Sequence, residues 1–255
     1  MDMKKTVVIT GAGSGLGRGL CLHLAQLDWR VLALDKNLDA AEQTVAMLPV
    51  PAKGQVYEID VSSPDEVDRF ATQMAEQRPD VLINNAGCQH VAPLEAFPSE
   101  KWASLIAVML QGTCLMTRSL LPGMREGGFG RIINIGSIHS LVASPYKSAY
   151  VAAKHGLIGF SKVVALETAD TDITINTICP SYIRTPLVDA QIADQAKAHH
   201  LTEAEVVDRI MLEPMPKKVF ITVEEVAAAV EFLIGSHARN ITGQTIVIDG
   251  GWTVR

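Results

Sequence analysis

The sequence is poor in the residues that mark several classes of protein. Cysteine occurs four times in 255 residues, never as C-x-x-C, and aromatic residues make up only 5%. The cysteines and histidines show no spacing typical of a zinc site. The adjacent His199 and His200 would point apart on a helix. We therefore expect neither a disulfide scaffold nor a metal site.

Long apolar runs and clusters of basic residues are also missing. The run "LIAVML" (105–110) is too short to span a membrane. The start "MDMKKTVVIT" lacks the apolar segment and cleavage site of a secretory signal. The net charge is −6 and the Lys/Arg pairs are isolated, whereas nucleic-acid binders usually carry a basic patch. We expect a soluble cytoplasmic protein with no nucleic-acid or membrane partner.

Short apolar segments, most of them rich in valine and isoleucine, alternate with amphipathic stretches along the whole chain. Nearly continuous apolar runs are typical of strands covered on both faces, and their alternation with helices predicts right-handed βαβ units. The predicted strands are 6–10, 30–35, 55–60, 80–85, 131–136, 173–178 and 244–249. The prediction is a single α/β domain over residues 1–255, with a Rossmann-type, doubly wound parallel sheet and helices on both faces. Residues 186–221 interrupt this alternation with a long, polar, helical insertion, which we expect to act as a substrate lid.

A glycine-rich turn, "VVITGAGSGLGRGL", follows the first predicted strand. Gly11, Gly15 and Gly17 fit the pattern T-G-x-x-x-G-x-G. Glycine allows a tight turn and a close approach of the backbone to a pyrophosphate, while the next helix offers its N-terminal N–H groups. The alternative is a glycine-rich turn without a ligand, but the preceding strand and following helix favour a dinucleotide site.

Three further strand ends point to the same ligand. Asp35 ends the second strand, where a carboxylate accepts hydrogen bonds from the ribose hydroxyls of NAD and repels the 2′-phosphate of NADP. Its alternative role is a helix N-cap. Asp60 and Val61 end the third strand, where we expect the adenine. The turn 84–87, "NNAG", ends the fourth strand and leaves room for a cofactor ribose. The expected cofactor is therefore NAD.

The stretch "SIHSLVASPYKSAYVAAK" (137–154) carries the candidate reacting groups. Pro145 fits the first turn of a helix with Ser144 as its N-cap, and this helix would place Tyr150 and Lys154 on one face. A tyrosine is a poor base at neutral pH, but a nearby ammonium and a positive nicotinamide lower its pKa. Tyr150 can then take the proton of an alcohol, with Ser137 bonded to the same oxygen. The alternative is an ordinary surface Tyr–Lys pair.

The sequence resembles the short-chain dehydrogenase/reductase family over essentially its whole length. The matching segments are "TGAGSGLG", "NNAG", the serine after "RIINIG", "YVAAK" and "NTICPSYIRTPL". The resemblance implies that Ser137, Tyr150 and Lys154 are catalytic and that the protein forms a homotetramer. The residues it implies for binding NAD are Gly11, Ser14, Gly15, Leu16, Gly17, Asp35, Asp60, Val61, Asn85, Ala86, Gly87, Tyr150, Lys154, Pro180, Ile183 and Thr185.

Within this family, a closer similarity is to the bacterial D-3-hydroxybutyrate dehydrogenases. It rests on "NNAGCQHVAPLEAFP", "ASPYKSAYVAAKHGL", "KVVALETA", "LVDAQI" and "IDGGWTVR". The similarity implies reversible, NAD-dependent oxidation of (R)-3-hydroxybutyrate to acetoacetate. The residues implied to hold the substrate are Gln89, His139, Lys147 and Gln191 at the carboxylate, with Tyr182 and Trp252 beside the methyl group.

Four of these substrate residues also have an ordinary structural explanation. Lys147 would be a solvated lysine, His139 a loop histidine bonded to backbone, Gln191 a polar lid residue and Trp252 part of C-terminal packing. Two other functions stay open: the same chemistry on another 3-hydroxy acid or a neutral alcohol, and an NAD-binding regulator without catalysis.

Two positions depart from the family pattern. Met109 stands seven residues after Trp102, where the family usually has an asparagine that fixes a water in the proton path from lysine to solvent. Methionine donates no hydrogen bond, and Gln111 would point elsewhere on the helix. We expect activity to survive, because Ser137, Tyr150 and Lys154 perform the primary steps. Ser181 replaces a usual glycine after the proline and is expected to shift that loop only slightly.

Overall fold

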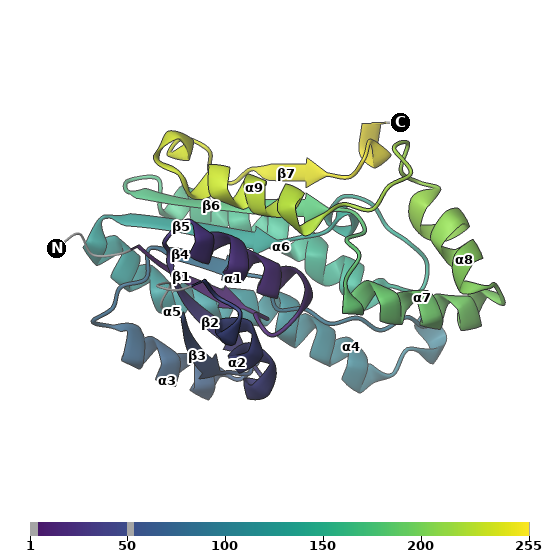
Figure 1. The fold of residues 1–255 in the computed structure, drawn as a ribbon, viewed down its shortest axis with the longest axis horizontal. Helices are drawn as coiled ribbons and strands as arrows, with labels where there is room; N and C mark the ends of the chain where they lie inside the picture. Colours follow the sequence, from purple (N-terminus) through teal and green to yellow (C-terminus); the bar gives the residue numbers. More distant parts are fainter. Residues whose placement is uncertain (1–4, 50–53, 255) are drawn as a thin grey trace.

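A computed structural model describes residues 5–49 and 54–254. Its centre is a parallel sheet of seven strands in the order β3-β2-β1-β4-β5-β6-β7 (Figure 1). The strands are β1 (Thr6–Thr10), β2 (Arg30–Asp35), β3 (Gly54–Glu58), β4 (Val81–Asn84), β5 (Phe129–Ile135), β6 (Asp172–Pro180) and β7 (Thr245–Ile248). The predicted fold class is confirmed, and all the predicted strands are present with ends that differ by up to two residues.

Helices cover both faces of the sheet. On one face, α1 (Gly15–Gln26), α2 (Leu38–Ala46) and α9 (Val223–Ile234) pack on one apolar core. On the other face, α3 (Pro64–Met74), α5 (Gly112–Gly127) and α6 (Ser148–Glu167) pack on a second core. Successive side chains of β1 point to opposite faces of the sheet: Val7 and Ile9 lie in the first core and Val8 in the second. Burial on both faces explains the continuous apolar runs of these strands.

Strand order reverses direction between β1 and β4, so the chain leaves these two strands toward opposite sides. In doubly wound sheets, ligands bind at the carboxyl ends of the strands beside such a point. The glycine-rich turn after β1 and Asn85 to Gly87 after β4 lie there. Asn85 ties the two loops together, since its Nδ2 donates to the carbonyls of Thr10 at 3.0 Å and Gly11 at 3.1 Å.

A long helical stretch runs from Ser99 to Gly127. It comprises α4 (Ser99–Ile106), a π-turn (Ala107–Gln111) and α5. By length and composition alone this stretch would suffice to cross a membrane, a test that core helices of soluble proteins also pass. Leu115, Met116 and Leu120 of α5 are buried in the second core. We therefore interpret the stretch as a core helix of this fold.

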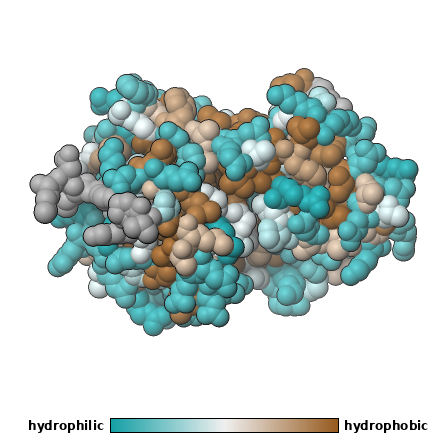
Figure 2. Space-filling view, viewed as in Figure 1, coloured by the Kyte–Doolittle hydropathy of each residue, from teal (hydrophilic) through white to brown (hydrophobic). Residues whose placement is uncertain are grey.

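The predicted insertion at 186–221 is helical and packs onto the body of the protein. It contains α7 (Pro186–His199), the short α8 (Glu203–Val206) and a second π-turn (Val207–Leu212). Val188, Ile192 and Met211 are buried in the first core. Figure 1 shows this insertion beyond the carboxyl ends of the strands, and Figure 2 shows the mixed hydrophilic and apolar surface of the same side.

Two local predictions are wrong. The third strand ends at Glu58, so Asp60 lies in the following loop, where its carboxylate accepts from the Ser62 N–H and hydroxyl. The helix carrying Tyr150 begins at Ser148. Tyr146 has a left-handed φ of 67°, which does not fit an α-helix, so the helix cannot start at Pro145. Pro145 and Ser144 therefore lie in the loop before the helix.

Candidate active site

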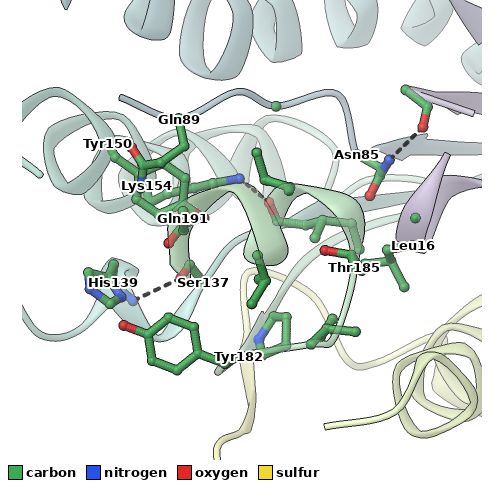
Figure 3. A pocket seen from close by; sticks show the side chains of 18 of the residues that line it. Leu16, Asn85, Gln89, Ser137, His139, Tyr150, Lys154, Tyr182, Thr185 and Gln191 are labelled. Atoms are coloured by element: carbon green, nitrogen blue, oxygen red, sulfur yellow. Dashed lines mark hydrogen bonds between the residues drawn. The ribbon is translucent and has the colours of Figure 1, made fainter. Parts of the chain in front are cut away.

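One cleft at the carboxyl ends of the strands, called the active-site cleft below, contains most of the predicted site residues. The cofactor residues that line it are Gly11, Ser14, Gly15, Leu16, Asp35, Asn85, Gly87, Tyr150, Lys154, Pro180, Ile183 and Thr185. The substrate residues that line it are Gln89, His139, Lys147, Tyr182 and Gln191, and Ser137 lies among them. Figure 3 shows two ends of this cleft, with Leu16, Asn85 and Thr185 apart from the Ser137–Tyr150 group.

Five predicted residues lie outside the lining of the cleft. Ala86 follows Asn85 and donates its N–H to the Thr10 hydroxyl at 3.0 Å. Gly17 packs against the glycine-rich turn, where a Cβ would lie 2.1 Å from the Gly11 carbonyl oxygen. The remaining three are Asp60, Val61 and Trp252.

The glycine-rich turn has the shape that a dinucleotide requires. Gly11 and Gly15 adopt left-handed φ values of 64° and 51°, which favour glycine. A Cβ on Gly13 would lie 2.8 Å from an Asp35 oxygen, so the turn needs a bare backbone there too. The turn leads directly into α1, whose N-terminal N–H groups suit a pyrophosphate. These residues therefore fit a dinucleotide cofactor.

Asp35 is placed to select among dinucleotides. Its carboxylate accepts the Gly13 N–H at 2.8 Å and the Asn37 N–H at 2.9 Å, and it lines the cleft. The cap of α2 is Asn37, whose side chain accepts from Ala40 N–H, so the N-cap alternative for Asp35 is wrong. A carboxylate fixed in this way suits ribose hydroxyls and opposes a 2′-phosphate.

Tyr150 and Lys154 lie one turn apart on α6, with the Lys154 ammonium 5.6 Å from the centre of the Tyr150 ring. Lys154 is only 5% exposed and donates to the Ile135 carbonyl at 2.6 Å, so a solvated surface pair is excluded. Ser137 begins the short helix after β5. Three polar groups thus converge on the cleft from two elements (Figure 3).

Burial is the largest cause of the pKa shifts of Tyr150 and Lys154. It raises the pKa of Tyr150, an effect that the hydrogen bond with Ser137 opposes. Burial also lowers the pKa of Lys154 to about 8. Burial therefore leaves the Tyr150 pKa raised, and the expected lowering would require the positive charge of an oxidised cofactor.

The end of the cleft beyond Ser137 holds a buried cation among neutral groups. Lys147 is 3% exposed, and its Nζ donates to the Tyr182 hydroxyl at 3.2 Å and to Gln191 Oε1 at 3.5 Å. In the described part of the chain no carboxylate pairs with it. Burial lowers the pKa of Lys147 to about 8. The solvated-lysine alternative is wrong. Gln191 is a polar residue of the lid, on α7, and its side chain is buried.

Two neutral polar groups complete this end. His139 is buried, and its Nε2 lies 2.8 Å from the Ser144 hydroxyl rather than a backbone group. Burial, together with the charge of Lys147, lowers the pKa of His139 to about 3, which leaves the ring neutral. Gln89 Nε2 is buried without a hydrogen-bond partner among the described residues. An unpaired amide facing a cleft with a lysine suits a bound carboxylate.

The structure adds contacts that the sequence did not indicate. Ser144, which the sequence predicted as a helix N-cap, is instead the partner of His139. Val188 lines the cleft from α7, and only the helical spacing of Val188, Gln191 and Ile192 points to an inward face. Ser181 donates its N–H to the Ile248 carbonyl at 2.9 Å and lines the cleft, so the serine is accommodated there.

Met109 lies behind Tyr150, in an apolar cluster. It is 1% exposed and packs with Leu105, Ala149 and Ala153, with Tyr150 beside them. The π-turn contains Met109, and its carbonyl accepts the Thr113 hydroxyl at 2.8 Å. Gln111 is exposed, so it does not replace the missing amide.

Comparisons with known proteins agree with this fold. Residues 5–196 match the family model described as short chain dehydrogenase. The chain is similar to a D-beta-hydroxybutyrate dehydrogenase of Rhizobium meliloti, at 42% identity over 99% of this chain and 100% of the relative. It is also similar to a D-beta-hydroxybutyrate dehydrogenase of Cupriavidus necator, at 40% identity over 98% of both chains. Among solved structures, 4-hydroxyisoleucine dehydrogenase complexed with NADH matches with a TM-score of 0.86 and 30% identity over 99% of this chain and 100% of that chain.

Proposed function

Since the chain belongs to the short chain dehydrogenase family, we propose that it reversibly oxidises (R)-3-hydroxybutyrate to acetoacetate with NAD. The observation that carries this proposal is Lys147, a buried cation with no carboxylate partner among residues 5–49 and 54–254, in the same cleft as Ser137, Tyr150 and Lys154. A small acid bound to this lysine would present a hydroxyl a few carbons away to the tyrosine. The similar dehydrogenases named above support the same substrate.

The residues divide the reaction between them. Bound NAD supplies the acceptor for the hydride that leaves the carbinol carbon. Tyr150 takes the hydroxyl proton as general base, and Ser137 donates a hydrogen bond to the same oxygen. Lys154 stabilises the phenolate from the next turn of α6. Asp35 selects NAD over NADP through the adenosine ribose.

The carboxylate is held by charge and by neutral donors. Lys147 provides the charge, while neutral His139 and the amides of Gln89 and Gln191 donate hydrogen bonds. Gln191 turns its Oε1 toward Lys147, so its Nε2 remains for the acid. The cleft thus provides several donors, as a small anion requires.

The family resemblance also suggests how the protein assembles. We propose a homotetramer, a state supported by apolar side chains left exposed on α4 and α6, such as Trp102, Val163 and Leu166. The proposed location is the cytoplasm. Sedimentation at several protein concentrations measures the assembly directly.

The test is NADH formation by the purified chain, followed by absorbance, with (R)- and (S)-3-hydroxybutyrate and with NAD and NADP. We expect turnover with the (R) acid and NAD, and its loss in Tyr150→Phe, which keeps the ring but not the proton acceptor. NAD binding without hydride transfer from any 3-hydroxy acid would contradict the proposal and favour a regulator. Turnover of neutral alcohols alone would contradict the acid substrate.

A further inference from the structure

Asp249 caps the C-terminal segment with both oxygens of its carboxylate. It follows β7 directly and is 8% exposed. One oxygen accepts the Gly251 N–H at 2.9 Å, and the other accepts the Thr253 N–H at 2.8 Å and the Thr253 hydroxyl at 2.7 Å. Burial raises the pKa of this carboxyl, but the hydrogen bonds outweigh burial and leave the pKa below its usual value. The cap is therefore charged at neutral pH.

The turn below this cap favours glycine at two positions. Gly250 and Gly251 have left-handed φ values of 62° and 91°. A Cβ on Gly250 would lie 3.2 Å from Met215, and one on Gly251 would lie 3.3 Å from Pro216. The Gly250 carbonyl also accepts the Lys217 N–H at 3.1 Å. The turn is thus fastened between β7 and the end of the 186–221 insertion.

Trp252, held in this turn, contacts two residues of the active-site cleft. Its ring lies 6.0 Å from the ring of His139 and 6.0 Å from that of Tyr182, measured between centroids. These two rings lie 6.4 Å from each other, so the three form one cluster. The Tyr182 hydroxyl in turn accepts from Lys147. Trp252 backs the groups proposed to hold the substrate carboxylate, without lining the cleft itself.

We infer that Asp249 is a positioning residue for substrate binding: its carboxylate fixes the turn that holds Trp252 against His139 and Tyr182. The inference rests on the proposed function, since it assigns the effect to the carboxylate end of the cleft. Neither Asp249 nor Thr253 touches the reacting groups. Weakening the cap therefore acts first on the acid site, and it reaches Tyr150 only through the His139 ring, whose centroid lies 6.0 Å from that of the Tyr150 ring.

A matched pair of variants at Thr253 tests this inference. Thr253→Val keeps the shape and the backbone N–H but removes the hydroxyl, whereas Thr253→Ser keeps the hydroxyl. Asp249→Asn removes the charge and one acceptor oxygen. We measure kcat and KM for (R)-3-hydroxybutyrate, for its neutral methyl ester and for NAD, together with the melting temperature.

We expect Asp249→Asn to raise the KM of the acid about tenfold, with Thr253→Val giving about threefold and Thr253→Ser no change. The kcat and the KM of NAD stay unchanged, and the preference for the acid over its ester falls. An unchanged acid KM in Asp249→Asn and Thr253→Val, with or without a lower melting temperature, overturns the inference. Equal losses for acid, ester and NAD also overturn it, because they indicate general loosening. If the unaltered chain forms no NADH from the acid, the proposed function fails, and the inference falls with it.

Discussion

Replacing Lys147 with methionine tests the central electrostatic element of the site. Methionine keeps an unbranched apolar stem but carries no charge, so the change removes the cation and little of the packing. Lys147 is 3% exposed and its two partners are neutral oxygens. A bound carboxylate would therefore meet the charge of Lys147 in surroundings that screen it weakly.

The expected effect is large and confined to one kinetic constant. Truncating one partner of a buried charge pair costs about 2–5 kcal/mol. A loss of about 3 kcal/mol corresponds to roughly a hundredfold rise in the KM of the acid, at 1.4 kcal/mol per factor of ten. The kcat stays within a few-fold, because Tyr150 and Ser137 are untouched.

The assay is steady-state NADH formation with the acid and with its methyl ester. Lys162→Met provides the matched control, since Lys162 is an exposed lysine on the same helix. A rise of less than about threefold in Lys147→Met would refute the assignment of this lysine to the substrate carboxylate, because a buried charge pair cannot contribute so little. Equal losses for acid and ester would refute it as well.

Three further outcomes are expected. Because burial lowers the pKa of Lys147 to about 8, the lysine loses its charge above that pH, and the KM of the acid, but not of the ester, rises there in a pH series. Asp35→Asn keeps an acceptor for Gly13 but removes the charge, so the ratio of kcat/KM for NAD over NADP falls by at least about tenfold; an unchanged ratio would contradict the role of Asp35. Met109→Asn buries an amide in an apolar cluster, so thermal unfolding shows a loss of about 1–3 kcal/mol with turnover unchanged; a much higher turnover would show that the proton relay is impaired in the natural chain.

The parts of the site that the sequence predicted correctly are those whose place depends on the helical repeat or on the end of a strand. The glycine-rich turn must follow β1 to reach a cofactor, and Tyr150 and Lys154 must face the same side because they lie one helical turn apart. Ser137 lies where β5 ends, as expected. Such placements depend on local geometry, and the parallel sheet then brings them together at one edge.

The contacts that the sequence did not predict depend on tertiary packing. The start of α6 is fixed by the left-handed Tyr146, a conformation that no residue pattern around Pro145 indicated. The pairing of His139 with Ser144 and the cap of Asp249 on Thr253 join short polar side chains whose partners follow from the loop path. These residue types occur in any loop, so their positions carried no signal.

The burial of Lys147 also bears on why the substrate should be an anion. The pKa difference from 10.5 to about 8 corresponds to roughly 3 kcal/mol against the charged form in the unliganded protein. Lys147 lies near Tyr182, Gln191 and His139, and no carboxylate of the described residues compensates this cost. A bound carboxylate opposes this effect of burial, since an opposite charge favours the protonated lysine and raises its pKa. Binding of the acid should therefore raise the pKa of Lys147 and take up protons near pH 8, whereas a neutral alcohol would leave the lysine as it is. Proton uptake on binding thus distinguishes an acid substrate from an alcohol substrate.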